Sequence, residues 1–144
     1  RLAYCLAGNL TWDFCYGNEF TDDTMNEIIT AMDKEYIKGF SLLGGEPFEK
    51  ENRMVVQYIL KTIKEHFPNK TVWCYSGFTF EELVGECEDI LKYIDVLVDG
   101  AFVAEKKNLK LKFRGSENQR IINVKKSLED KTVTELTEGE YDEY

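Results

Sequence analysis

The sequence contains no segment suited to a lipid bilayer and carries little positive charge. No apolar run approaches the roughly 20 residues that a membrane-spanning helix needs, and no signal peptide is visible. Lys and Arg number 18 against 27 Asp and Glu, which gives a net charge of −9. A phosphate backbone needs a cationic face, so this balance argues against nucleic acid as a partner. We therefore expect a soluble, cytoplasmic protein that binds neither membranes nor nucleic acid.

The sequence is also short of histidine and of clustered cysteine. Its one histidine, His66, falls late in an expected helix. Any Ser-His-Asp or Cys-His arrangement would have to use it, and an ordinary helix-end role suits it better. The four cysteines form neither a CxxC pair nor a zinc-binding spacing: Cys5, Cys15, Cys74 and Cys87. A chain this apolar does not need disulfides, so we expect reduced thiols, with Cys74 and Cys87 in the core.

The length and composition favour one folded domain. The chain has 144 residues, of which 43% are apolar and 13% aromatic. The charge is uneven, because residues 129–144 hold seven acids and one base. Such a segment is typical of a solvated, mobile terminus, and a docking segment for a basic partner is the alternative. We expect a single domain over residues 1–128 and an acidic, mobile tail over residues 129–144.

The hydrophobic pattern alternates between strand and helix signals. Apolar residues at helical spacing predict helices over residues 24–38, 49–66 and 79–94, with capping boxes at Thr24/Glu27 and Thr79/Glu82. A polar loop is expected up to residue 17. Short apolar runs predict strands over residues 1–6, 40–43, 71–75, 96–98, 109–113 and 121–124. This alternation predicts an α/β fold with a parallel sheet and right-handed crossovers.

Three of these strands end in polar or glycine-containing segments. Ligands of parallel sheets bind beyond the carboxyl ends of the strands, so residues 44–47, 75–77 and 99–100 should converge on one edge. Gly44 and Gly45 allow close backbone approach, and Pro47 keeps Glu46 extended. Exposed carbonyls beside one carboxylate suit a cationic amine. The alternatives are a tight turn that binds nothing and a Glu46 that serves the following helix dipole.

The other polar segments allow both a binding and an ordinary interpretation. Ser76 and Asp99 are either site residues or turn residues next to a glycine. Residues 114–120 are dense in hydrogen-bond donors, and Arg114 and Arg120 suit a carboxylate or phosphate. An ordinary polar loop is the alternative.

Six stretches together resemble one family. They are residues 11–14 (Thr-Trp-Asp-Phe), 39–47 (Gly-Phe-Ser-Leu-Leu-Gly-Gly-Glu-Pro), 52–53 (Asn-Arg), 73–78, 95–100 (Asp-Val-Leu-Val-Asp-Gly) and 113–120 (Phe-Arg-Gly-Ser-Glu-Asn-Gln-Arg). Their types and order resemble the activating proteins of anaerobic ribonucleoside-triphosphate reductase, which are radical S-adenosylmethionine enzymes. The resemblance covers most of residues 11–123.

The resemblance implies a fold, two cofactors and a reaction. The fold would be an incomplete, TIM-like barrel of parallel strands with outer helices. Three thiolates would hold a [4Fe–4S] cluster that reductively cleaves S-adenosylmethionine, using a reductant such as flavodoxin. The resulting 5′-deoxyadenosyl radical would abstract hydrogen from a glycine in the reductase's glycyl radical domain. Gly44, Gly45 and Glu46 would contact the cofactor's methionyl amino group, Pro47 would belong to the same cofactor-binding segment, and Ser76 and Asp99 would line the same pocket.

The sequence departs from the family at the cluster loop. The family carries CxxxCxxC just before the Thr-Trp-Asp-Phe segment, whereas only Cys5 stands there in this sequence. Cys5 is thus the one candidate cluster ligand, and Cys15 matches no ligand position. Two explanations remain open. The sequence is part of a longer protein whose cluster loop lies outside it, or the protein is a cluster-less regulatory or S-adenosylmethionine-binding partner of the reductase. A generic nucleotide-binding module is disfavoured by the absence of GxGxxG and P-loop motifs.

Overall fold

The computed structural model describes residues 3–7, 10–13, 20–43 and 46–144. The strands within these residues are β1 (Ala3–Ala7), β2 (Leu10–Asp13), β3 (Gly39–Leu43), β4 (Thr71–Tyr75), β5 (Val96–Asp99) and β6 (Arg120–Asn123). The α-helices are α1 (Asp22–Met32), α2 (Arg53–His66), α3 (Phe80–Val84), α4 (Glu88–Leu91) and α5 (Val124–Asp130). Two 3₁₀ turns, η1 (Ala104–Lys106) and η2 (Glu138–Glu143), complete the described elements.

The six strands form one open, mixed sheet in the order β2-β1-β3-β4-β5-β6. The α/β prediction is confirmed, and β3, β4 and β5 are parallel neighbours. A wholly parallel sheet was the wrong prediction, because β1, β2 and β6 pair in antiparallel fashion. Two residues separate β1 from β2, and the connection from β5 to β6 contains the 3₁₀ turn η1 but no α-helix. Parallel neighbours need a long crossover, so such direct connections favour antiparallel pairs.

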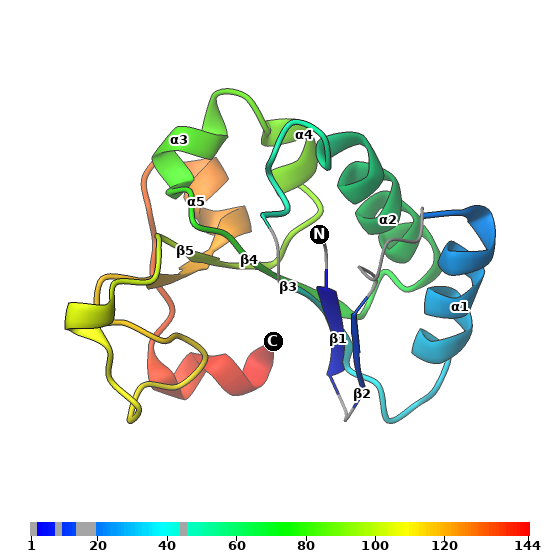
Figure 1. Cartoon of the computed structure of the whole chain (residues 1–144), viewed down its shortest axis with the longest axis horizontal. Coiled ribbons are helices and arrows are strands. Elements are labelled where there is room, and N and C mark those ends of the chain that lie inside the picture. Colours follow the sequence, from blue (N-terminus) through cyan, green and yellow to red (C-terminus); the bar gives the residue numbers. More distant parts are fainter. Residues whose placement is uncertain (1–2, 8–9, 14–19, 44–45) are drawn as a thin grey trace.

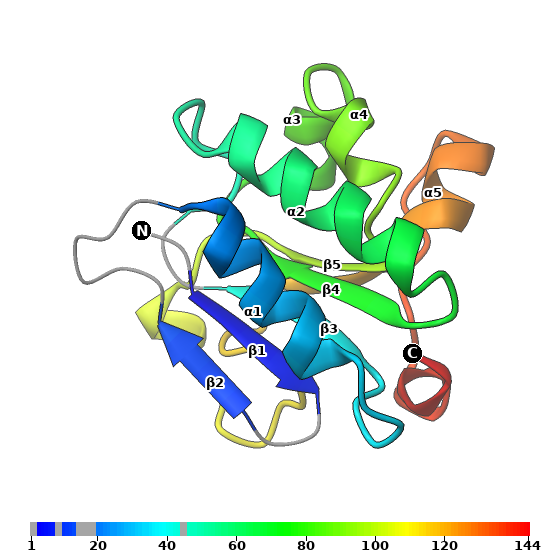
Figure 2. The same ribbon diagram turned by 90° about the vertical axis from the view of Figure 1, so that its right-hand side faces the viewer.

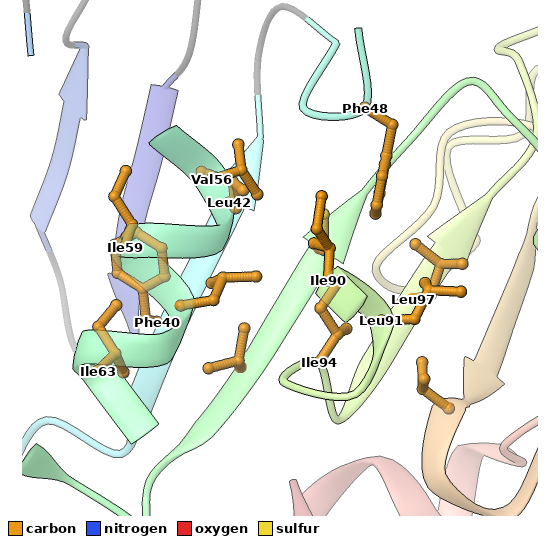
Figure 3. Packing of buried hydrophobic residues seen from close by; sticks show 14 of the residues in the cluster. Phe40, Leu42, Phe48, Val56, Ile59, Ile63, Ile90, Leu91, Ile94 and Leu97 are labelled. Carbon is orange, nitrogen blue, oxygen red and sulfur yellow. The ribbon is translucent and has the colours of Figure 1, made fainter. Parts of the chain in front are cut away.

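The α-helices cover one face of the sheet, and η2 lies on the other (Figure 1). A side view shows the same division between α1, α2 and α5 and the C-terminal turn (Figure 2). Side chains alternate along β4, so Val72 and Cys74 join the helical core while Trp73 points to the second face. Helix α2 contributes its apolar stripe to the helical core, facing Phe40 and Leu42 of β3 (Figure 3). The stripe consists of Val56, Ile59, Leu60 and Ile63.

Local sequence signals account for most helix boundaries. Thr79 and Glu82 form the expected capping box of α3. Helix α1 begins earlier than predicted, because Thr21 is its cap and pairs with Thr24. The helix expected over residues 79–94 is two short helices separated by a turn at Gly85. Residues 10–13, expected in a loop, form β2.

No strand forms over residues 109–113, contrary to the prediction. Leu109 is 88% exposed, and Phe113 has a φ of 63°. A strand requires negative φ angles, so the backbone at Phe113 cannot be part of one despite the alternating apolar residues. The segment belongs instead to a long connection between β5 and β6.

The acidic C-terminal segment packs against the sheet. The backbone N–H of Leu136 donates to the carbonyl of Ile121 at 2.7 Å, and Leu136 is 5% exposed. Tyr141 and Tyr144 pack with Trp73 in the second-face cluster. The sequence predicted a mobile tail because its acids outnumber its few apolar residues, yet those residues anchor it. The boundary at residue 128 stays a prediction.

Among the residues that the structure describes, none of the helices has the length and apolar character required to span a bilayer.

Gly39 is required by the close approach of β3 and β4. A Cβ at Gly39 would lie 2.3 Å from the carbonyl oxygen of Thr71. Gly39→Ala is therefore expected to lower the free energy of unfolding by about 3 kcal/mol, because two paired backbones must move apart. Gly85→Ala is the control, since no atom lies within 4 Å of its Cβ position. Urea unfolding measures both, and equal stability of the two variants contradicts this packing.

Candidate functional site

The carboxylate of Glu46 lies at the carboxyl ends of two parallel strands. Glu46 follows β3 in the chain, and Ser76 directly follows β4. The Ser76 hydroxyl lies 2.9 and 3.0 Å from the two Glu46 carboxylate oxygens. The backbone N–H groups of Gly77 and Phe48 donate to the same carboxylate at 2.6 and 2.9 Å. The structure thus brings Glu46 and Ser76 together at one edge of the sheet.

The Glu46 carboxylate keeps capacity for a further donor. Ser76 has a single hydroxyl proton, so the three neighbouring groups supply three donated hydrogen bonds, against about four acceptor positions of a carboxylate. Glu46 is partly exposed. Among the described residues, no Lys or Arg lies within 4.0 Å of its carboxylate oxygens, the limit for an ion pair. A fixed, partly exposed and unneutralised carboxylate is suited to a cationic amine.

The backbone after Glu46 is held in a tight turn. The Glu46 carbonyl accepts from the Glu49 N–H at 3.2 Å and from the Asn52 side chain at 2.9 Å. The expectation of an exposed carbonyl is therefore wrong at Glu46, because these two donors occupy it. Pro47 is buried and shapes the turn. Gly44 and Gly45 lie outside the described residues.

Two residues that sequence reasoning left without a role build this turn. Asn52 binds the Glu46 carbonyl, and the Arg53 Nε donates to the Phe48 carbonyl at 2.8 Å. Residues 75–77 were expected at this edge, with a plain turn as the alternative, and the Gly77 N–H is the nearest donor to the Glu46 carboxylate. The only sequence signal for a role of Asn52 and Arg53 was that Asn-Arg is one of the six family-like stretches.

Asp99 stands apart from the Glu46 carboxylate. Its side chain is 1% exposed and pairs with Arg120 at 2.5 Å. It also accepts the backbone N–H of Phe80 at 2.8 Å, which ties β5 to the start of α3. Asp99 and Glu81 raise the pKa of Arg120 through hydrogen bonds, and Arg120 in turn lowers the pKa of Glu81. Asp99 therefore has a structural role in this position, because it joins β5 to β6 and to the start of α3.

The donor-rich segment over residues 114–120 satisfies groups of the chain itself. Arg114 donates to the Gln119 carbonyl at 2.5 Å, while Arg120 pairs with Asp99 and Glu81. Arg120 is engaged at Nε, Nη1 and Nη2, whereas Arg114 is bonded only through Nη1. The ordinary structural interpretation therefore holds for Arg120, and binding of a carboxylate or phosphate by Arg114 stays a prediction.

The described cysteines do not fit an iron–sulfur cluster. Cys74 and Cys87 are buried, unpaired by any disulfide, and part of the helical core, as predicted. Desolvation by burial raises the pKa of both thiols, which disfavours the thiolate that iron requires. No three His, Cys, Asp or Glu side chains gather into a metal site within the described residues. The side chain of Cys5 and all of Cys15 lie outside those residues.

These two thiols should resist alkylation in the native protein. Iodoacetamide at pH 8 is expected to leave the Cys74 and Cys87 peptides unmodified and to label both fully in denaturing urea, because burial blocks access and suppresses ionisation. Mass spectrometry of tryptic peptides measures this. Rapid native labelling of either thiol contradicts its place in the core.

Comparisons with known proteins point to one family. A family model described as a 4Fe-4S single cluster domain matches residues 3–122. The activating protein of anaerobic ribonucleoside-triphosphate reductase from Enterobacteria phage T4 is 37% identical over 113 residues, spanning 77% of this chain and 69% of the relative. The protein of that name from Vibrio cholerae is 37% identical over 113 residues (77% and 73%). That from Escherichia coli is 34% identical over 111 residues (76% and 72%).

No solved structure matches the chain. The family match covers most of the chain, and the three relatives share one name. The chain belongs to the family of anaerobic ribonucleoside-triphosphate reductase-activating proteins.

Proposed function

We propose that this protein activates an anaerobic ribonucleoside-triphosphate reductase by reductive cleavage of S-adenosylmethionine. In this reaction S-adenosylmethionine would take up one electron and its C5′–S bond would break, giving methionine and a 5′-deoxyadenosyl radical. Transfer of a hydrogen atom from a glycine of the reductase would then leave a glycyl radical and 5′-deoxyadenosine. Support comes from the curated relatives, whose names specify activation of this reductase.

The observation that carries the proposal is the Glu46 carboxylate. It is held by three donors, is partly exposed, and has no cationic partner among the described residues. The methionyl ammonium of S-adenosylmethionine would supply the missing charge and the remaining hydrogen bond. Gly44 and Gly45 precede Glu46 and would bring the backbone close to the same group. Ser76 would act by fixing the carboxylate, and Asp99 by holding the neighbouring strand end.

A [4Fe–4S] cluster would deliver the electron, with a reductant such as flavodoxin upstream. The family match describes a 4Fe-4S single cluster domain. The described residues do not fit such a cluster, so none of them is given a role in delivering the electron. Cys5 remains the one proposed ligand. The incomplete barrel of the radical S-adenosylmethionine enzymes likewise stays a proposal, since the described strands form an open sheet.

An alternative is a cluster-less partner that binds S-adenosylmethionine without cleaving it. It is favoured by the absence of CxxxCxxC from the 144 residues. Anaerobic reconstitution with iron and sulfide, followed by dithionite and S-adenosylmethionine, separates the two. The proposed function predicts about four irons per chain and formation of 5′-deoxyadenosine. Binding of S-adenosylmethionine with no iron uptake and no cleavage would favour the alternative.

A further inference from the structure

The connection between β5 and β6, residues 101–119, is unlike the rest of the chain in charge. We call it the β5–β6 loop. It holds five basic and two acidic residues, a net charge of +3 in a chain whose net charge is −9. Lys106, Lys107, Lys110 and Lys112 are exposed. Among the described residues, none of these four lysines forms an ion pair.

The β5–β6 loop also displays apolar side chains beside its lysines. Phe102 is 55% exposed, Leu109 is 88% exposed and Phe113 is 50% exposed. They account for three of the six large apolar side chains that are exposed among the described residues. Exposed apolar groups interspersed with unpaired cations are typical of a surface that meets a partner.

Side-chain hydrogen bonds close the base of the β5–β6 loop. The Gln119 side chain accepts from the Gly115 and Ser116 N–H groups at 2.8 and 3.1 Å and donates to the Gly100 carbonyl at 3.1 Å. The Asn118 side chain donates to the Ala101 carbonyl at 2.8 Å. These bonds use the polar groups at the base. The four lysines, Phe102 and Leu109 take no part in these bonds and remain exposed.

Topology places the β5–β6 loop at the edge that carries the candidate site. The loop leaves β5 at its carboxyl end and enters β6, the antiparallel neighbour, at the same edge. Glu46 and Ser76 lie at the carboxyl ends of β3 and β4, which run parallel to β5. The loop (yellow in Figure 1) lies on the side of the sheet away from α1 and α2. A partner held by this loop would lie at the edge of the sheet that carries Glu46.

An aromatic contact joins the β5–β6 loop to the acidic segment η2. The Phe113 ring packs edge-on against Tyr141 of η2, with centroids 5.6 Å apart, and against Trp73 at 5.0 Å. The segment η2 is acidic, with Glu138, Glu140 and Glu143. An acidic segment with an aromatic side chain therefore already rests against one end of the loop. It leaves Phe102 and Leu109 exposed.

We propose that the β5–β6 loop is the docking surface for an acidic, apolar-bearing surface of a partner protein. On the proposed function, on which this inference rests, that partner is the anaerobic reductase. Charge complementarity would orient the encounter, and Leu109 and Phe102 would supply the buried apolar contact. The four lysines would act together as a local positive patch in a chain whose net charge is negative.

The test is a pair of charge-reversal variants that change the net charge equally. Lys110→Glu/Lys112→Glu alters the loop, and Lys61→Glu/Lys92→Glu alters exposed lysines of α2 and the end of α4, which cover the other face of the sheet. Binding to the cognate reductase is measured by biolayer interferometry at two salt concentrations. The loop variant is expected to raise Kd at least tenfold and to flatten its salt dependence, whereas the control stays within about twofold.

A second pair tests the apolar contact with matched exposure. Leu109 is 88% exposed and Met54 of α2 is 84% exposed. Leu109→Ser is expected to raise the reductase Kd about fivefold without altering its salt dependence, and Met54→Ser to leave it unchanged. Equal Kd values for the two variants would show that Leu109 does not contact the reductase, which contradicts the apolar part of the proposal.

The outcomes separate this inference from the proposed function. If the unaltered protein binds the reductase and the loop variant binds equally well, the docking inference is overturned and the proposed function stands. If the loop variant loses binding but no S-adenosylmethionine is cleaved by any variant, docking stands and the proposed chemistry fails. Absence of binding by the unaltered protein overturns both. Binding of a single-stranded oligonucleotide is measured in parallel. If the loop variant loses only this binding and still binds the reductase, the loop is a nucleic-acid site and the inference is overturned.

Discussion

Replacing Glu46 with glutamine is expected to weaken S-adenosylmethionine binding about thirtyfold. The substitution keeps the shape of the side chain but removes the charge that a methionyl ammonium would need. A hydrogen bond between charged groups contributes about 2 kcal/mol, which corresponds to that factor. The amide also presents an NH₂ group toward the Gly77 and Phe48 N–H groups, which now donate to the carboxylate. Isothermal titration of the purified protein with S-adenosylmethionine measures the effect.

The control for this variant is Glu49→Gln. Glu49 is an exposed acid in the same turn, so the two variants have the same net charge. Its affinity for S-adenosylmethionine should match that of the unaltered protein. A Glu46→Gln protein that binds as tightly as Glu49→Gln would show that the Glu46 carboxylate is a structural group and not part of the binding site.

Replacing Arg120 with methionine is expected to lower the free energy of unfolding by about 3 kcal/mol. The variant leaves the Asp99 carboxylate, 1% exposed, with the Phe80 N–H as its one remaining donor. Removing one partner of a buried ion pair is costly because the other charge stays desolvated. The guanidinium also links β6 to Glu81 at the start of α3. Urea unfolding of the variant measures the loss.

Two further variants identify the buried charge as the cause. Glu81→Gln removes only the exposed arm of the network, since the Glu81 side chain is 59% exposed, and should cost less than about 1 kcal/mol. Asp99→Asn/Arg120→Met removes the uncompensated charge and should recover part of the stability lost in Arg120→Met. A single Arg120→Met loss no larger than that of Glu81→Gln would contradict the account.

The sequence predicted the neighbourhood of Glu46 because it depends on strands that are adjacent in space and parallel. Glu46 and Ser76 each stand just beyond an apolar run, and the ends of parallel neighbours meet at one edge. Asp99 shows the same pattern after β5, yet its environment depends on Arg120, which arrives from an antiparallel strand. Periodicity carries no information about such a non-local partner, so a site residue and a buried ion-pair residue look alike in the sequence.

The segments that sequence reasoning placed wrongly are those where tertiary contacts override local pattern. Apolar alternation over residues 109–113 suggested a strand, but Phe113 turns back onto Trp73 with a positive φ. The acidic C-terminal segment suggested mobility, but Leu136 and Tyr144 anchor it on the second face. In both cases a few apolar residues determine where a strongly charged segment packs. The average composition of the segment does not reveal the effect of these single residues.

The central claim is that the protein makes a glycyl radical on its reductase. The most direct measurement is electron paramagnetic resonance of the cognate reductase after anaerobic incubation with the reconstituted protein, S-adenosylmethionine and a reductant. The account predicts a glycyl radical doublet on the reductase, accompanied by 5′-deoxyadenosine, and a strongly reduced signal with Glu46→Gln. A complex that forms between the two proteins, binds S-adenosylmethionine and yields neither radical nor 5′-deoxyadenosine would contradict it.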